Sequence, residues 1–534
     1  MATDLPTHVD AAIIGAGFSG LYALHRLRDE LGLSVRLFEA AGGLGGTWYL
    51  NRYPGAKCDS ESHVYCFSFD EDLLQEWNWS GKYPGHGEIR RYLRHVAERF
   101  DLNRSIDLNT RVTAARYDEA SATWTVTTST GEVVTASYFV TGIGVLAVSP
   151  YTPQFPGMDS FQGEVYHTGG WPHEGVDLRG KRVGVVGTGS SGTQAVPVIA
   201  EQAEHLTVFM RTAQYGIPAR EETATPAFFR DVKNNYPEIF ETARQSAGGF
   251  PWEHNGIRAL DVSATERQTR YEAGWAEGGF KFALGSFRDV AYDPDANATM
   301  SDFMREKIRE TVRDPETREK LIPQHPFLSR RPIVESGYFE AYNRDNVQLK
   351  DVRSNPIVEF TPRGLRTSEA EHELDVVVFA TGFDAVTGPF FRMDLTGRNG
   401  AKLTDTWADG PRAFMGLQTV DFPNMFMVTG PGSTVGNLPL TIETHVDWIT
   451  NAIADLRRDG LASIEASPQA EAQWSEHVAG EVERSLIPQA ESWYTGANIP
   501  GKKRAPYFYF GHFGKYRQML VDSAAQGYPG FIRR

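Results

Sequence analysis

Two glycine clusters in this sequence have the spacing of a phosphate-binding turn. Each reads G-x-G-x-x-G, and the clusters comprise Gly15, Gly17 and Gly20, then Gly187, Gly189 and Gly192. In such a turn the first glycine permits the tight bend, the second lets the backbone approach a pyrophosphate, and the third lets helix and strand pack closely. The helix that follows offers free N–H groups to the phosphates. Two such turns predict two nucleotides bound by one chain.

The residue after the second strand of each unit indicates which nucleotide it binds. The strand expected over residues 34–38 runs into Glu39. This carboxylate can accept hydrogen bonds from a ribose diol and would repel a 2′-phosphate, so the first site suits FAD or NAD. The strand expected over residues 206–210 is followed by Arg211 and Thr212. A guanidinium can pair with a 2′-phosphate, so the second site should prefer NADPH over NADH.

Each glycine cluster lies where the motif requires it, after an expected strand and, at the first site, before residues 21–31 with helical spacing. The two strands are expected over residues 10–14 and 181–186. A third apolar strand, residues 374–380, leads into A-T-G-F-D and looks like the connection that returns the chain to the first fold in flavin monooxygenases and related reductases. We therefore predict an α/β protein with two Rossmann-like dinucleotide-binding domains.

Residues 216–330 have a different, helical character. Met304, Ile308 and Val312 fall on one helical face, and Ser301 is a candidate N-cap. We expect a helical insertion that packs on the second nucleotide fold. The expected domain limits are residues 1–145 and 385–534 for the FAD domain, 146–215 and 331–384 for the NADP domain, and 216–330 for the insertion.

Composition narrows the class of protein. The chain has 534 residues, too many for one core, and a net charge of −15, which disfavours nucleic acids and anionic membranes as partners. We expect neither a membrane span nor a signal peptide, and hence a cytoplasmic protein. Cys58 and Cys66 lack a C-x-x-C spacing, so we expect two buried thiols and no disulfide, metal or redox pair.

A further motif lies between the two glycine clusters and reads F-x-G-x-x-x-H-x-x-x-W-P. Its defined positions are Phe161, Gly163, His167, Trp171 and Pro172. Together with the flanking clusters it resembles the type I Baeyer–Villiger monooxygenases, and segments at residues 45–59, 330–332 and 492–502 extend the resemblance over nearly the whole chain. The resemblance implies FAD and NADPH as cofactors. It also implies a reaction of O2 with a ketone, through a flavin C4a-peroxide, to give an ester or lactone, with sulfoxidation as a side activity.

The resemblance places the catalytic arginine at Arg331 and its counterion at Asp59. A fixed cation in a dry site stabilises both a peroxide anion and the negatively charged adduct, and arginine stays charged when desolvated. A plain inter-domain salt bridge is the alternative for this pair. His167 is expected to set how the linker couples the two domains rather than to transfer protons.

The resemblance also assigns cofactor contacts. Those to FAD are Gly15, Gly17, Ser19, Gly20, Glu39, Thr47, Trp48, Asp59, Tyr65, Val112 and Leu438. Those to NADP are Lys57, Gly187, Thr188, Gly189, Ser190, Ser191, Gly192, Thr193, Gln194, Arg211, Thr212, Arg330, Arg331 and Trp493. Arg330 stands where the family usually has lysine, and Trp493 belongs to a mobile C-terminal loop near residues 490–505.

Residues 430–440 match a loop of the ketone pocket, where Ser433, Thr434 and Gly436 leave room for cyclic or bulky ketones. We expect a monomer or weak oligomer. The nearest alternative is a flavin-containing monooxygenase that oxygenates amines or thioethers. A flavin disulfide reductase would need a close cysteine pair, and a nucleotide-binding redox sensor would not need Asp59 and Arg331.

Overall fold

The first of two large sheets contains the first glycine cluster. The computed structural model describes residues 7–146 and 149–534. Eight strands form this sheet in the order β17-β4-β5-β6-β1-β2-β3, with β18 paired to β6. Their bounds are β1 His8–Ile14, β2 Val35–Phe38, β3 Ile106–Asp107, β4 Val112–Asp118, β5 Thr123–Thr128, β6 Val133–Thr141, β17 Asp394–Thr396 and β18 Met425–Met427. β6, β1, β2 and β3 run parallel, so their carboxyl ends share the edge at which Rossmann folds bind nucleotides.

The second sheet contains the second glycine cluster. It has five parallel strands in the order β12-β9-β8-β16-β7. Their bounds are β7 Glu164–His167, β8 Arg182–Val186, β9 His205–Met210, β12 Val347–Asp351 and β16 Val376–Phe379. β8 leads through the glycine turn into α5 (Ser190–Gln202), and Ala195, Val196 and Ile199 of α5 are fully buried in the core of this sheet. The predicted strands of both folds are confirmed within a residue or two at each end.

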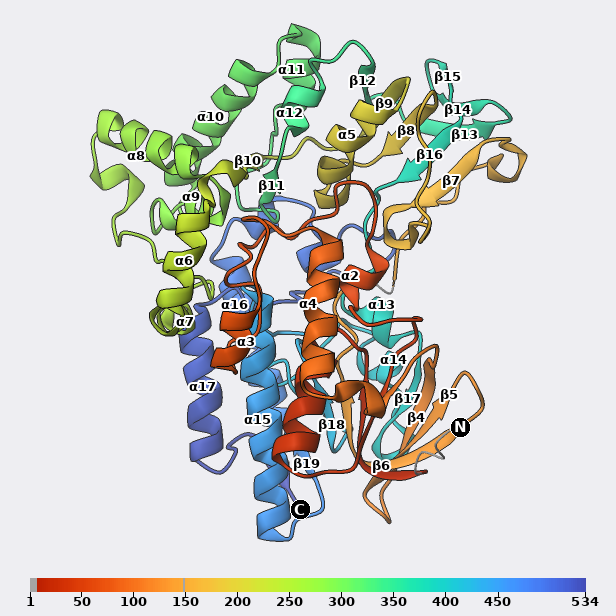
Figure 1. The fold of residues 1–534 in the computed structure, drawn as a ribbon, viewed down its shortest axis with the longest axis vertical. Coiled ribbons are helices and arrows are strands. Elements are labelled where there is room, and N and C mark those ends of the chain that lie inside the picture. Colours follow the sequence, from red (N-terminus) through yellow and green to blue (C-terminus); the bar gives the residue numbers. More distant parts are fainter. Residues whose placement is uncertain (1–6, 147–148) are drawn as a thin grey trace.

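Four helical segments pack together beside the first sheet, in the lower half of Figure 1. They are α1 (Phe18–Leu24), α4 (His86–Arg99), α15 (Leu438–Asp459) and α17 (Phe513–Ala525). The helix predicted over residues 21–31 begins three residues earlier and continues as a π-helical segment, His25–Glu30. After β16 the chain therefore returns to the first fold, where it supplies β17, β18, α15 and α17.

The predicted helical insertion is present at the upper left of Figure 1. Its helices are α6 Pro226–Asn234, α7 Tyr236–Gln245, α8 Ala264–Glu277, α9 Gly279–Gly285, α10 Pro294–Thr311 and α11 Pro315–Leu321. Ile308 and Val312 lie in the core of the second sheet, whereas Tyr236 and Phe240 lie in the core of the first. The insertion thus packs on the second nucleotide fold and also contacts the first, a contact that sequence analysis did not include.

The N-cap assigned to Ser301 is wrong. Helix α10 starts seven residues earlier, and the Asp293 carboxylate accepts hydrogen bonds from the Asp295 and Ala296 amides. Ser301 is buried inside the helix, where its hydroxyl donates to Asn297. The apolar spacing of Met304, Ile308 and Val312 is confirmed, because all three are buried.

The remaining elements are helix α16, which has 16 residues, and a set of shorter helices and strands. They are α2 Thr47–Leu50, α3 Glu71–Glu76, α12 Tyr338–Ala341, α13 Thr387–Phe390, α14 Leu403–Thr406, α16 Pro468–Glu483, β10 Gly216–Pro218, β11 Ile333–Glu335, β13 Ile357–Thr361, β14 Gly364–Thr367, β15 Glu371–Glu373, β19 Ile464–Ala466 and β20 Phe531–Arg533. Cys58 and Cys66 are both buried free thiols, as expected. Within the described residues, no helix combines the length and apolar character that a bilayer span needs.

Candidate active site

A cavity of about 1100 Å³ is lined by both glycine turns. The FAD-assigned residues that line it are Gly15, Gly17, Ser19, Glu39, Thr47, Trp48, Asp59, Tyr65, Val112 and Leu438. The NADP-assigned residues that line it are Lys57, Gly187, Thr188, Gly189, Ser190, Ser191, Gln194, Arg211, Thr212, Arg330, Arg331 and Trp493. Sequence positions hundreds of residues apart therefore meet around one space.

Three assigned glycine-turn residues do not line this cavity. A Cβ added to Gly20 would lie 1.7 Å from the Gly15 carbonyl oxygen, and one added to Gly192 would lie 2.1 Å from that of Gly187. These glycines let each helix pack on its strand, which is the third role of the motif. Thr193 is buried beside Gly192, and its hydroxyl donates to the Thr188 carbonyl at 3.4 Å.

The turns have the shape and chemistry to hold the two dinucleotides. Within the described residues, a Cβ at Gly189 would meet no atom within 4 Å, so the backbone there can be approached closely. The Glu39 carboxylate accepts hydrogen bonds from the Ala16 and Ala41 amides, each at 2.7 Å, which aims it at the first turn. Burial raises the pKa of Glu39, and these amide contacts partly offset the effect. Glu39 is thus placed to accept hydrogen bonds from an FAD ribose.

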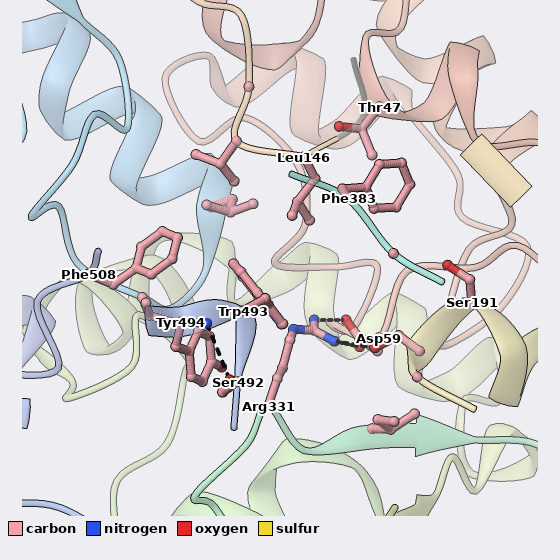
Figure 2. Close-up of a pocket in the computed structure, with 18 of the residues that line it drawn as sticks. Thr47, Asp59, Leu146, Ser191, Arg331, Phe383, Ser492, Trp493, Tyr494 and Phe508 are labelled. Atoms are coloured by element: carbon pink, nitrogen blue, oxygen red, sulfur yellow. Dashed lines mark hydrogen bonds and ion pairs between the residues drawn. The ribbon is translucent and has the colours of Figure 1, made fainter. Parts of the chain in front are cut away.

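Arg331 and Asp59 form a two-bond ion pair at the cavity wall (Figure 2). Nη1 donates to Oδ2 at 2.5 Å, and Nη2 donates to Oδ1 at 2.6 Å. Burial acts to lower the pKa of Arg331, but the charge and hydrogen bonds of Asp59 outweigh it and raise this pKa. The Phe280 ring centroid lies 5.7 Å from the guanidinium carbon. The result is a permanently charged, oriented cation beside an apolar wall.

The segment that carries Asp59 is hydrogen-bonded to α5 of the second fold. The Tyr53 hydroxyl donates to Gln194 Oε1 at 2.7 Å, and Gln194 Nε2 donates to the Lys57 carbonyl at 3.0 Å. Lys57 itself forms an ion pair with Glu221 of the insertion at 2.7 Å. The position of Asp59 therefore depends on both nucleotide folds and on the insertion.

Arg330 and Arg211 line a strongly positive part of the cavity. Burial lowers the pKa of Arg330 to about 10, and the charges of Arg211 and Arg353 act in the same direction, while Glu491 opposes them. Among the described residues, Arg330 Nε has no hydrogen-bond partner. An anion would complete this cluster, which fits the 2′-phosphate of NADPH.

The C-terminal segment contributes aromatic side chains to the same cavity. Trp493 and Tyr494 project from a 3₁₀ turn, and Phe508 follows later in the chain (Figure 2). Burial raises the pKa of Tyr494, so the phenol stays neutral. Sequence analysis assigned Trp493 but missed Tyr494 and Phe508, for which no local pattern predicts a place in the cavity.

The insertion lines the same cavity with an apolar wall, which sequence analysis missed. The wall comprises Phe250, Trp252, Phe280, Phe287 and Tyr292. The Phe250 and Trp252 rings stack with centroids 5.1 Å apart. No spacing in the sequence identifies these aromatic residues, because three separate segments supply them. The loop over residues 430–440, which sequence analysis did identify, lines the cavity through Ser433, Thr434, Val435, Gly436 and Leu438.

None of the described linker-motif residues lines the cavity. His167 ends β7, where its Nδ1 accepts a hydrogen bond from the Gly169 amide at 2.9 Å and its Nε2 lies 3.4 Å from the Thr381 hydroxyl. Burial lowers the pKa of His167, which leaves a neutral ring. Phe161 packs against Phe360, and Trp171 is buried in the core of the second sheet. A Cβ added to Gly163 would lie 2.4 Å from a backbone oxygen, and Pro172 is half-buried.

Comparison with known proteins agrees with this geometry. The family described as "Flavin-binding monooxygenase-like" matches residues 9–227. A Baeyer-Villiger monooxygenase of Pseudooceanicola batsensis is 46% identical over 98% of this chain and 96% of its own length. A phenazine N-monooxygenase of Lysobacter antibioticus is 44% identical over 98% of this chain and 97% of its own length. The structure of a steroid monooxygenase bound to NADP superposes with a TM-score of 0.94 at 48% identity, covering 98% of this chain and 99% of that one.

Two nucleotide folds around one cavity, with an enclosed cation and an apolar wall, define a flavoprotein monooxygenase. Its two Rossmann-type folds serve FAD and NADP. The chain belongs to the type I Baeyer–Villiger monooxygenases, and its cofactors are FAD and NADPH.

Proposed function

We propose that this enzyme converts apolar ketones, cyclic or bulky ones included, into esters or lactones. One atom of O2 enters beside the carbonyl, the other leaves as water, and NADPH supplies the two electrons. The observation that carries this proposal is the Arg331–Asp59 pair at the wall of a cavity that aromatic side chains also line, with Phe280 against the guanidinium. The aromatic lining favours an apolar substrate, and the small side chains of Ser433 and Gly436 leave room beside it.

Bound FAD, once reduced by NADPH, supplies the activation of O2. Arg331 stabilises negative charge that develops on the oxygen of the ketone carbonyl. Asp59 orients the guanidinium through two charge-assisted hydrogen bonds. Its negative charge also offsets part of the positive potential that Arg331 exerts in the cavity. Trp493 and Tyr494 help to close the cavity and exclude water, which strengthens the electrostatic effect of Arg331.

The second candidate activity is oxygenation of a ring nitrogen. The phenazine N-monooxygenase is nearly as similar to this chain as the Baeyer-Villiger relative is, at 44% against 46% identity. A planar heteroaromatic compound would also suit the aromatic wall formed by Phe250, Trp252 and Phe280.

Product analysis with isotope-labelled O2 distinguishes the two activities. The FAD-loaded enzyme is given NADPH and a panel containing cyclohexanone, phenylacetone, a steroid ketone, phenazine and a thioether. We expect an ester or lactone that carries one labelled oxygen from at least one ketone. An N-oxide from phenazine with no ester from any ketone would reject the ketone proposal in favour of the second candidate. Sulfoxide formation decides nothing, since both activities permit it.

A further inference from the structure

We propose that Arg353 is a third arginine of the 2′-phosphate site, beside Arg211 and Arg330, and that it strengthens the preference for NADPH over NADH. Arg353 lies in the second part of the NADP domain, residues 331–384, but outside both glycine turns and outside the cofactor contacts that sequence analysis assigned. The proposal rests on the NADPH dependence of the enzyme and is independent of whether the substrate is a ketone.

The sheet topology brings Arg353 to this site. Strands β9 and β12 are parallel neighbours, with Asp351 in register with Met210. The Val352 amide donates to the Met210 carbonyl at 2.9 Å, so the pairing continues one residue beyond β12. The chain segments that leave the two strands therefore lie side by side at the carboxyl edge of the sheet, where nucleotides bind in this fold. Arg211 and Arg353 meet there although 142 positions separate them.

Two hydrogen bonds set the direction of the Arg353 side chain. Its Nε donates to the Arg211 carbonyl at 3.1 Å, and its Nη2 donates to the Thr212 hydroxyl at 3.1 Å. Thr212 in turn accepts a hydrogen bond at its carbonyl from Thr188 of the second glycine turn, at 2.9 Å. A guanidinium has five N–H groups, so those that remain can bind an anion beside Arg211. The backbone of this turn is held by Asp351, which accepts a hydrogen bond from the Arg353 amide at 2.9 Å.

The charge balance of the cluster favours a phosphate. Arg211 and Arg353 are exposed, whereas Arg330 is half-buried and its Nε lacks a partner among the described residues. The pKa of Arg330 is lowered by burial and by the two neighbouring arginines, with Glu491 as an opposing charge. A phosphate dianion would relieve this repulsion and could bind more than one guanidinium at once. A diol without phosphate, as in NADH, would leave the repulsion in place.

The test separates phosphate recognition from simple bracing of the loop. Dissociation constants of 2′,5′-ADP and of 5′-AMP, which differ only by the 2′-phosphate, are measured calorimetrically on the FAD-loaded enzyme. Arg353→Met should weaken 2′,5′-ADP by about tenfold, the scale of one charge-assisted contact, and leave 5′-AMP unchanged. Arg353→Lys should lose less, because the charge stays. Arg344→Met is the matched control, since Arg344 is an exposed arginine at the opposite end of β12.

Salt supplies a second measurement on folded protein. If Arg353 contacts the phosphate, added salt should weaken 2′,5′-ADP binding more in the parent than in Arg353→Met, because screening acts on the lost charge. An equal loss of both ligands in Arg353→Met would show that Arg353 only braces the loop. Unchanged affinity for both ligands would also overturn the proposal.

Discussion

At the level of single residues, the Arg331 guanidinium is the centre of the site. Two bonds to Asp59 fix its plane, and its remaining N–H groups stay available to an incoming oxygen atom. Ser190 Oγ is 3.5 Å from Nη1, and the Phe280 ring centroid is 5.7 Å from the guanidinium carbon. Because such a pair is partly desolvated, loss of either member leaves an uncompensated charge. Under the proposed function, both members are needed, because Asp59 orients the guanidinium and Arg331 carries the charge.

The Arg331→Ala change should reduce ester formation by at least about a hundredfold, the usual cost of removing a preorganised charge. NADP+ binding should persist, because the phosphate cluster and the second glycine turn are untouched. Rates of ester formation and of NADPH oxidation are measured separately. Arg331→Lys is the graded control, since it keeps the charge but loses the two-bond geometry. Ester formation near the parental rate in the alanine variant would contradict the proposed role of Arg331.

Glu443 of α15 supplies a pH prediction for stability. Burial raises its pKa from the ordinary value of 4.5 to about 7, and hydrogen bonds from Ser68 offset this in part. The folded protein therefore binds the Glu443 proton more tightly than the unfolded chain does. The stabilisation from this proton is complete below about pH 4.5 and is lost as the pH rises through about 7.

The Glu443→Gln change should remove that dependence. Between about pH 5 and about pH 8, the variant should gain up to about 3 kcal/mol of unfolding free energy relative to the parent. Urea unfolding of the FAD-loaded enzyme at several pH values measures this difference. Glu98→Gln, at an exposed glutamate, is the control and should show no such trend. A constant difference between Glu443→Gln and parent over this pH range would show that Glu443 does not titrate there.

At the level of elements, short sequence patterns were sufficient to predict those parts of the site that depend on a few neighbouring residues. The strands, the glycine turns and the polarity of Glu39 and Arg211 all follow from short segments. The start of α10 did not, because the Asp293 cap and the burial of Ser301 depend on tertiary packing. The Arg331–Asp59 contact joins positions 272 apart, so only family resemblance could suggest it. The aromatic wall and Arg353 had no local signal at all.

Strand β7 contains the central part of the linker motif, including His167. It is the edge strand of the second sheet, and His167 is in register with Phe379 at the end of β16. The chain returns to the first fold directly after β16, and the His167 ring contacts both Thr381 and Phe383 there. The incoming and outgoing connections between the two folds are thus joined at one histidine. This arrangement supports a positioning role for His167, away from the cavity.

His167→Ala should uncouple NADPH oxidation from oxygenation, because the two connections would no longer be held together. We expect hydrogen peroxide release per NADPH to rise by about tenfold, while ligand affinity in the second fold stays near parental. His167→Asn retains an acceptor for the Gly169 amide and should restore most of the coupling. Normal coupling in the alanine variant would exclude the positioning role. A pH profile of coupling should show no step near the usual histidine pKa, since the buried ring stays neutral.

At the level of the whole molecule, the cavity is assembled by parts that no single domain supplies. Asp59 comes from the first fold, Arg331 from the connection before β11, and Trp493 from the C-terminal segment. The insertion reaches both cores and also pairs Glu221 with Lys57 beside the Asp59 loop. A relative movement of the folds would therefore change the geometry around Arg331. These contacts depend on the complete tertiary structure, which is why sequence analysis identified the contact of the insertion with the second fold but not its contact with the first.

Residues of the C-terminal segment bind the turn at residues 383–385, which joins the two folds. Lys502 Nζ forms an ion pair with Asp384 and donates to the Ala385 carbonyl at 2.6 Å. Asn498 Nδ2 donates to the Phe383 carbonyl at 2.9 Å. Lys502 is largely buried, with its Nζ 4.8 Å from the Tyr507 ring centroid. These contacts lie in the same segment as Trp493 and Tyr494, which line the cavity, and they support the proposal that this segment closes it.

Lys502→Met should release this segment and leave an unpaired carboxylate at Asp384. We expect cleavage within residues 490–505 under limited proteolysis to become about tenfold faster, because cleavage follows the population of the open form. NADP+ should protect the variant less than it protects the parent. Lys503→Met is a closely matched control. In the part of the chain that the structure describes, the ion pair of the adjacent Lys503 is with exposed Asp409 at 3.3 Å, and such surface pairs contribute little. Equal cleavage of the two variants would show that the Lys502–Asp384 contact does not hold the segment closed.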